Sequence, residues 1–192
     1  PELRPGQLVV DASTSEPDVT RRLAADLADR GISFCAAPVT GGPAEAAAGQ
    51  LATLLGAAPA DVARASAVVR HWSAVVRHVG APGTGHTAKL LNNFVTQGTT
   101  VLLAEAYDRA RRAGVDWQAL FDAMQAGAAR SGTLEKAVRP ALSGDYDGAR
   151  FAMRNSLKDL GYYGALAASM DALFAELKER WGSLDFLVHA IA

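Results

Sequence analysis

The sequence predicts an α/β sheet followed by an all-α domain, and three observations support this prediction. Apolar, strand-like runs alternate with helical segments over residues 1–84, which is the pattern of α/β architecture. Residues 85–169 contain only helical patterns. From residue 170 a helix, a Gly-Ser break and a strand-like run follow, up to residue 192. We therefore divide the chain into segments 1–84, 85–169 and 170–192.

The first segment contains four apolar runs of strand length. Because they are apolar along their whole length, they favour a parallel sheet that is covered on both faces. Glycines and prolines separate these runs from the helices between them, and the stretch 38–43 is expected to be a loop. The predicted strands are Gln7–Asp11, Ile32–Ala37, Gln50–Leu55 and Val75–Val79, and the predicted helices are Asp18–Arg30, Ala44–Gly49 and Ala60–His71.

The second segment begins with a long helical stretch, His86–Ala113, which Gly114 ends. Its middle carries amide and threonine side chains, so it is not a membrane helix. Apolar residues lie all round it, which indicates a helix buried in an all-α domain. The expected helices after it are Trp117–Ala126, Gly132–Leu142 and Phe151–Ala168.

Composition and charge exclude several classes of protein. The chain has 192 residues, of which 49% are hydrophobic, and 19 basic against 20 acidic side chains; this balance argues against nucleic acid as a partner. No apolar run is long enough to span a membrane, and the first residues lack a signal-peptide pattern. The single cysteine, Cys35, fits a buried apolar position and a reducing compartment, so we expect a cytoplasmic protein. The four histidines show no metal-ligand spacing, and no metal site is predicted.

A glycine-rich turn leads directly into the long helix. Gly80, Gly83 and Gly85 lie between a strand and the helix, where backbone N–H groups point outward and a ligand can approach closely. Lys89 follows on the first turns, and Asn93 lies four residues later on the same helical face. A lysine in apolar surroundings can transfer protons near neutral pH. The alternative is a surface lysine after an ordinary turn, because the spacing alone is weak evidence.

Two further groups of polar residues are candidates. Thr40, Gly41 and Gly42 end a predicted strand, and a threonine hydroxyl with two glycine amides is suited to hold a carboxylate; a plain turn is the alternative. Lys158 and Asp159, together with Asn155, share one face of the last large helix. For this face, a solvated surface is the more probable interpretation from sequence alone.

Taken together, these motifs resemble the β-hydroxyacid dehydrogenase family, of the 3-hydroxyisobutyrate dehydrogenase type. The resemblance covers residues 6–168 and depends on several motifs in the same order. Four motifs at plausible separations are much more specific than any one of them. They are Val10-Asp11-Ala12-Ser13-Thr14, Ala37-Pro38-Val39-Thr40-Gly41-Gly42, the block Gly80–Asn93, and Phe151 with Lys158-Asp159-Leu160.

The resemblance implies a function and a role for each matching residue. The chain would transfer a hydride between a short 3-hydroxy acid and NAD or NADP, with Lys89 as the catalytic acid–base group. Thr40, Gly41, Gly42 and Asn93 would bind the substrate, and Ser13, Thr14, Phe151 and Lys158 would lie at the cofactor. A homo-oligomer through the helical domain is expected, with no nucleic acid and no membrane as partner. Two departures, Ala36 where the family has Asp and Thr40 where it has Ser, bear on the choice of substrate.

The two ends of the chain depart further from the family. The expected fold is a partial Rossmann-like sheet, because the N-terminal βαβ unit with its pyrophosphate loop is absent; without this anchor the chain could be inactive. The segment 170–192 instead resembles a fragment of enoyl-acyl-carrier-protein reductase, which suggests a chimera of two dehydrogenase fragments. A divergent family ending is the alternative. Two other functions stay open: a non-catalytic helical dimerisation or scaffold fragment, and an enoyl reductase fragment carried by the tail.

Overall fold

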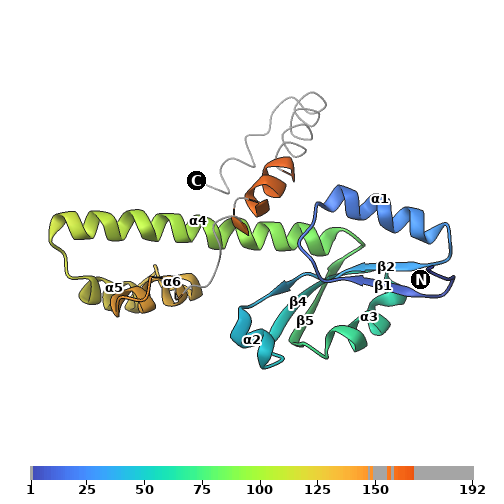
Figure 1. The fold of residues 1–192 in the computed structure, drawn as a ribbon, viewed down its shortest axis with the longest axis horizontal. Coiled ribbons are helices and arrows are strands. Elements are labelled where there is room, and N and C mark those ends of the chain that lie inside the picture. The colour runs from blue at the N-terminus through green and yellow to red at the C-terminus, as the bar shows by residue number, and fades with distance from the viewer. Residues whose placement is uncertain (1, 147, 149–154, 157, 167–192) are drawn as a thin grey trace.

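The computed structural model describes residues 2–146, 148, 155, 156 and 158–166, and contains a sheet region and a helical region joined by one long helix (Figure 1). This agrees with the predicted order of a partial Rossmann-like sheet followed by helices. The predicted tail helix and the strand Leu184–Ala192 lie outside the described residues. Among the described residues, no helix has the length and apolar character that a membrane span requires.

The sheet contains five strands with a helix packed on each face. The strands are β1 (Leu8–Asp11), β2 (Ser33–Ala36), β3 (Val39–Thr40), β4 (Leu51–Gly56) and β5 (Ser73–Gly80). Helix α1 (Pro17–Ala28) packs beside Phe34 and Ile32 on one face, where Leu27 is buried. Helix α3 (Val62–Val69), which follows the short 3-10 helix η1 (Pro59–Asp61), covers Cys35 and Leu55 on the other face. The buried Cys35 matches its predicted apolar position.

The prediction of a parallel sheet is wrong in part, because the sheet is mixed. β1 pairs with β2 and β4 pairs with β5 in parallel, whereas β2 and β3 both run antiparallel to β4. Residues 41–50, which include the short helix α2 (Pro43–Ala47), connect β3 to β4. This connection is too short for the crossover that a parallel pair needs. The predicted loop at 38–43 therefore contains a short strand, β3.

The helical region is built on α4 (Thr84–Ala113), with α5 (Trp117–Ala126) and α6 (Gly132–Leu142) packed beside its C-terminal half (Figure 1). Their shared core consists of Leu103, Tyr107, Phe121, Leu134 and Val138. The described part of the following segment, residues 155, 156 and 158–166, is also helical. We call this part the terminal helical segment.

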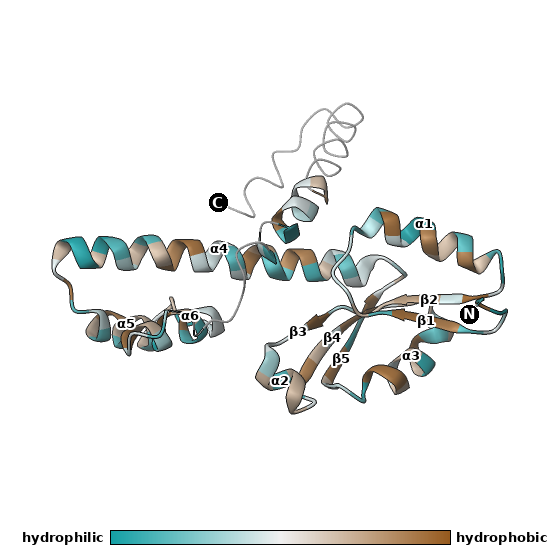
Figure 2. Cartoon of the chain, in the orientation of Figure 1, coloured by the Kyte–Doolittle hydropathy of each residue, from teal (hydrophilic) through white to brown (hydrophobic). Residues whose placement is uncertain are grey.

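One face of α4 differs from the prediction of a fully buried helix. Leu91, Val95, Val101 and Leu102 are 48%, 63%, 67% and 72% exposed, and Phe94 beside them is 43% exposed. Figure 2 shows hydrophobic residues along the middle of this helix. We call these five residues the α4 apolar face. The sequence pattern correctly shows that the helix is apolar all round, but a pattern cannot show whether something covers each face.

Candidate functional site

The first turn of α4 lies directly on the backbone of the sheet. Gly83 has φ 95° and precedes the helix, where a side chain would be strained. A Cβ on Gly85 would meet the carbonyl oxygens of Leu54 and Ala36 at 2.6 and 2.7 Å. Only glycine therefore allows α4 to start at the point where β2 and β4 meet. This contact fixes the position of Lys89, one turn later, relative to the sheet.

Lys89 belongs to a cluster of polar side chains between α4 and the terminal helical segment. Asn93 donates a hydrogen bond from Nδ2 to Oδ2 of Asp159 at 2.6 Å, and both residues are buried. Nζ of Lys158 lies 3.3 Å from the other carboxylate oxygen of Asp159. Phe94 stacks on Tyr163 beside this hydrogen bond, with the ring centroids 4.1 Å apart. The structure thus brings Lys89, Asn93 and Lys158 together as neighbours of one buried carboxylate.

The electrostatics of this cluster act on Lys89 in opposite directions. Burial lowers the pKa of Lys89 below its ordinary value of 10.5, and the positive charge of Lys158 lowers it further, while the carboxylate of Asp159 raises it. Burial is the largest of these causes, so the net shift is downward. A lysine in such a site can give up and regain a proton more readily than a solvated one.

The predicted substrate loop ends β3. Thr40 is half-buried at the end of that strand, and Gly41 has φ 131°, a conformation that favours glycine. The N–H of Gly42 is already engaged, because it donates to Oε2 of Glu45 at 2.8 Å. The other oxygen of Glu45 accepts a hydrogen bond from Nζ of Lys136 at 2.6 Å. The loop is therefore connected through Glu45 to helix α6 of the helical region.

These contacts lower the pKa of Glu45 from 4.5 to about 2. The hydrogen bond with Lys136 is the largest cause, and hydrogen bonds with backbone groups, including the one from Gly42, lower the pKa further. Glu45 consequently stays ionised under all ordinary conditions. The sequence analysis did not identify Glu45 or Lys136, because they lie far apart in the chain and neither belongs to a motif.

The predicted cofactor-side residues Ser13 and Thr14 follow the carboxyl end of β1. Ser13 is exposed, and its backbone N–H donates to Oδ1 of Asp11 at 2.9 Å. The carboxyl ends of strands at a sheet edge are where open α/β sheets bind nucleotides. Phe151, the remaining cofactor-side candidate, lies outside the described residues.

Asp159 is the member of this cluster whose burial could not be predicted from the sequence. A solvated surface was the favoured interpretation of its helix face, and the structure contradicts this for Asp159, which is only 6% exposed. Asn155 and Lys158 on the same segment are exposed, as expected. The one sequence signal was the spacing of three polar residues on one face, which cannot show which of them faces a neighbouring helix.

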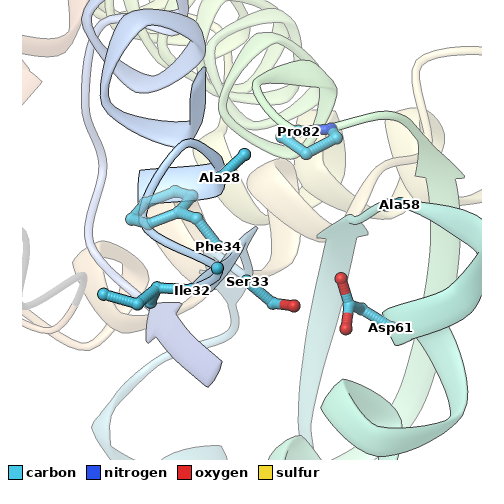
Figure 3. A pocket seen from close by; sticks show the side chains of 8 residues that line it. Ala28, Ile32, Ser33, Phe34, Ala58, Asp61 and Pro82 are labelled. Carbon is cyan, nitrogen blue, oxygen red and sulfur yellow. The ribbon is translucent and has the colours of Figure 1, made fainter. Parts of the chain in front are cut away.

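An open pocket elsewhere on the sheet holds none of the predicted site residues. It has a volume of about 350 Å³ and lies between β2 and the residues around η1. Figure 3 shows the hydroxyl of Ser33 and the carboxylate of Asp61 pointing into the space between them. The site described above is therefore distinct from this pocket.

Two family models match the chain over most of its length. Residues 1–80 match the NAD binding domain of 6-phosphogluconate dehydrogenase. Residues 83–180 match the NAD-binding domain of NADP-dependent 3-hydroxyisobutyrate dehydrogenase. The second match runs into the segment 170–192, and the comparisons do not support the expected resemblance of that segment to enoyl-acyl-carrier-protein reductase.

Individual proteins give the same picture. An uncharacterized oxidoreductase of Shewanella frigidimarina is 29% identical over 95% of this chain and 67% of its own length. L-threonate dehydrogenase of Cupriavidus necator is 34% identical over 83% of this chain and 54% of its own. The structure of Mycobacterium tuberculosis 3-hydroxyisobutyrate dehydrogenase with L-serine is 26% identical, with a TM-score of 0.80, over 98% of this chain and 71% of that one. The chain spans between about one third and two thirds of the length of curated relatives that it matches.

Proposed function

The chain belongs to the β-hydroxyacid dehydrogenase family, and from that premise we propose that it transfers a hydride reversibly between a short 3-hydroxy acid and NAD or NADP. Lys89 is the group that moves the proton. The observation that supports this most is the position of Lys89, which is half-buried one turn before Asn93 and its buried hydrogen bond to Asp159; burial there lowers the pKa of Lys89. A positioned proton donor of this kind contributes about 10²–10⁴ in rate.

Each residue of the cluster has a distinct part in this proposal. During reduction, Nζ of Lys89 gives its proton to the carbonyl oxygen of the substrate, and during oxidation it takes the proton of the hydroxyl group. Asp159 holds the amide of Asn93, so that this side chain is oriented before substrate arrives. The positive charge of Lys158 lowers the pKa of Lys89 and so makes loss of its proton easier.

The cofactor supplies the hydride chemistry when bound. Ser13 and Thr14, at the carboxyl end of β1, fit the nicotinamide side of such a molecule, because Ser13 is exposed and Thr14 partly exposed where open α/β sheets bind nucleotides. Lys158, with Phe151 nearby in sequence, would approach it from the helical region. We take residues 1–84 as the partial dinucleotide-binding part of the chain and 85–169 as its helical part.

Thr40, Gly41 and Gly42 would receive the substrate carboxylate. Because the N–H of Gly42 is bonded to Glu45, we assign the contact to the Thr40 hydroxyl and the backbone of Gly41. The relatives named for threonate and 3-hydroxyisobutyrate support a short hydroxy acid as substrate, since both compounds carry a carboxylate and a hydroxyl group.

The test combines binding with turnover. The wild-type chain is titrated with NADH and NADPH by fluorescence and is then assayed with a panel of short 3-hydroxy acids. Lys89→Ala is expected to bind the cofactor and lose turnover by about 10²-fold or more. Lys89→Arg is the matched control for charge, because it keeps the positive charge but cannot release a proton near neutral pH. Turnover that survives in Lys89→Arg would refute the assignment of Lys89. Failure of the wild-type chain to bind either cofactor at millimolar concentration would support a non-catalytic scaffold instead.

We further propose that two copies of the chain associate through the α4 apolar face. Its five large side chains lie on one side of a single helix, and an exposed apolar surface of this kind marks an interface. A helix can pack on its own symmetry mate across a two-fold axis, so that one stripe forms both halves of the contact. Gly98, where a Cβ would have nothing within 4 Å, leaves room in the middle of the stripe for close approach.

Light scattering after size-exclusion chromatography tests this proposal. The wild-type chain is expected to elute as a dimer, and Val95→Glu with Leu102→Glu as a folded monomer. Arg112→Glu on the same helix, which lies outside the face, is the control and should stay dimeric. A wild-type monomer would refute this proposal. We also propose that the protein acts in the cytoplasm. Its single cysteine is free and buried, which suits a reducing compartment.

A further inference from the structure

His86 is a buried titratable group for which the proposed reaction has no use. It lies on α4 one turn before Lys89, and its side chain is 0% exposed. Nδ1 of the ring lies 2.7 Å from Oγ1 of Thr20 in α1. Nε2 lies 3.8 Å from Oδ2 of Asp11, at the end of β1. The imidazole of His86 therefore lies between the end of β1 and helix α1.

The hydroxyl of Thr20 decides which ring nitrogen carries the hydrogen. Burial lowers the pKa of His86, so the ring is neutral and holds a single N–H. Thr20 has one hydroxyl hydrogen and two possible acceptors, Nδ1 of His86 at 2.7 Å and the carbonyl oxygen of Glu16 at 3.1 Å. If the hydrogen goes to Nδ1, the histidine must carry its own hydrogen on Nε2. If it goes to Glu16, the hydrogen of the ring lies on Nδ1.

The carboxylate of Asp11 favours the first arrangement. With hydrogen on Nε2, the N–H dipole points at a negative charge, whereas the other tautomer directs a lone pair at that charge across 3.8 Å. Within the described residues Nε2 makes no hydrogen bond of good geometry, but the carboxylate of Asp11 and a backbone group of Ser13 both raise the pKa of His86, so both attract hydrogen on the ring. The shorter distance from Thr20 to Nδ1 favours the same arrangement.

Asp11 connects this pair to the exposed loop after β1. One of its carboxylate oxygens faces His86, and the other accepts the backbone N–H of Ser13 at 2.9 Å. Attraction between Nε2–H and the first oxygen therefore limits rotation of the carboxylate and keeps the second oxygen on Ser13. A residue chosen only to fill this space would not need a polar atom on the side that faces Asp11.

We propose that His86 is a positioning residue: its Nε2–H holds Asp11, and Asp11 holds the Ser13–Thr14 loop in place relative to the turn of α4 that carries Lys89. The role of that loop toward a nicotinamide cofactor rests on the proposed function. The connection from His86 through Asp11 to Ser13 does not, and it can be measured without any activity.

The first experiment determines the tautomer. Long-range ¹H–¹⁵N NMR of the full chain, labelled at histidine, is expected to show His86 neutral with hydrogen on Nε2 at pH 7. A neutral ring with hydrogen on Nδ1 would overturn the proposal, because a lone pair would then face Asp11.

The second experiment uses two variants that keep different halves of the imidazole. The amide of glutamine can take the place of Nε2 and donate to Asp11, whereas the shorter asparagine can replace only Nδ1. Hydrogen exchange at the Ser13 amide should be about ten-fold faster in His86→Asn than in the wild type, because the hydrogen bond from Ser13 to Asp11 weakens when Nε2–H no longer restrains the carboxylate. In His86→Gln it should stay within about three-fold of the wild type. Equal exchange rates in the two variants would mean that His86 only fills space.

Cofactor titration of the same proteins separates this inference from the function. If the dehydrogenase proposal holds, the Kd for NAD(P)H rises in His86→Asn and recovers in His86→Gln. A rise in both variants, or in neither, would contradict the positioning role. If the wild-type chain binds no cofactor, the proposed function fails, and the tautomer and exchange results still decide on His86.

Discussion

The hydrogen bond between Asn93 and Asp159 gives the sharpest test of the site, because it joins residues 66 positions apart. Both side chains are more than 90% buried, and the distance from Nδ2 to Oδ2 is 2.6 Å. A hydrogen bond to a charged group contributes about 1.5–3 kcal/mol to stability. We therefore expect a double-mutant cycle of Asn93→Ala and Asp159→Ala to give a coupling energy of about 1.5–3 kcal/mol.

Urea denaturation of the wild type, the two single variants and the double variant measures this coupling. Each single variant leaves a buried amide or carboxylate without its partner. The losses of stability in the two single variants should therefore add up to more than the loss in the double variant. A control cycle pairs Asp159→Ala with Gln118→Ala, which changes an exposed residue on α5. That cycle should be additive within about 0.5 kcal/mol. A coupling below about 0.5 kcal/mol for Asn93 and Asp159 would show that the terminal helical segment does not dock on α4 as described.

Three further predictions follow from single residues. Gly85→Ala should destabilise the chain by about 1–3 kcal/mol or more in urea, because its Cβ meets backbone atoms. Gly98→Ala has no atom of the same chain within 4 Å, so in the monomeric Val95→Glu/Leu102→Glu protein it should instead stabilise the fold by about 0.5–1 kcal/mol. Burial lowers the pKa of His86 from 6.5, so below that pH the unfolded chain binds a proton that the folded chain does not. Stability should be complete above about pH 6.5 and fall below it by at most about 1.4 kcal/mol per pH unit, and His86→Gln should flatten this slope in thermal melts. Lys158→Met removes a charge that lowers the pKa of Lys89, so the acid limb of the pH profile for hydroxy-acid oxidation should move to higher pH; an unchanged limb would contradict the assignment.

Helices α5 and α6 could be predicted from sequence to the residue, because capping side chains set their starts, whereas the predicted ends of α1, α3 and α4 differ from the observed ones by up to two residues. Asp116 and Ser131 accept hydrogen bonds from backbone N–H groups at the starts of α5 and α6. Gly114 ends α4 in the left-handed conformation, with φ 70°. The direction of β4 could not be predicted in this way. Its apolar pattern fits a parallel or an antiparallel neighbour equally well, and only the length of the connection through α2 distinguishes them.

Spacing could predict neighbours within the cluster only where they share one helix. Lys89 and Asn93 lie on one face of α4 by spacing alone. Asp159 and Lys136 reach their partners across the fold, at separations of 66 and 91 residues. No period or motif in a single sequence records such a contact. Their importance follows from tertiary burial and distance, which is why the sequence favoured a solvated face for the helix that carries Asp159.

The properties of Lys89 depend on segments at both ends of the described chain. Gly85 holds α4 against β2 and β4, which fixes the position of Lys89, one turn later, relative to the sheet. The terminal helical segment brings Asp159 and Lys158, the two charges that act on Lys89 in opposite directions. A chain shortened before residue 155 would keep α4 and its lysine but lose both charges and leave Asn93 without its carboxylate partner. Lys89 would then lose part of its burial, and its pKa should return toward the ordinary 10.5. The acid–base function we propose for Lys89 therefore requires that the helical region be complete through residue 159, and a lysine on the same helix without that segment would be an ordinary surface cation.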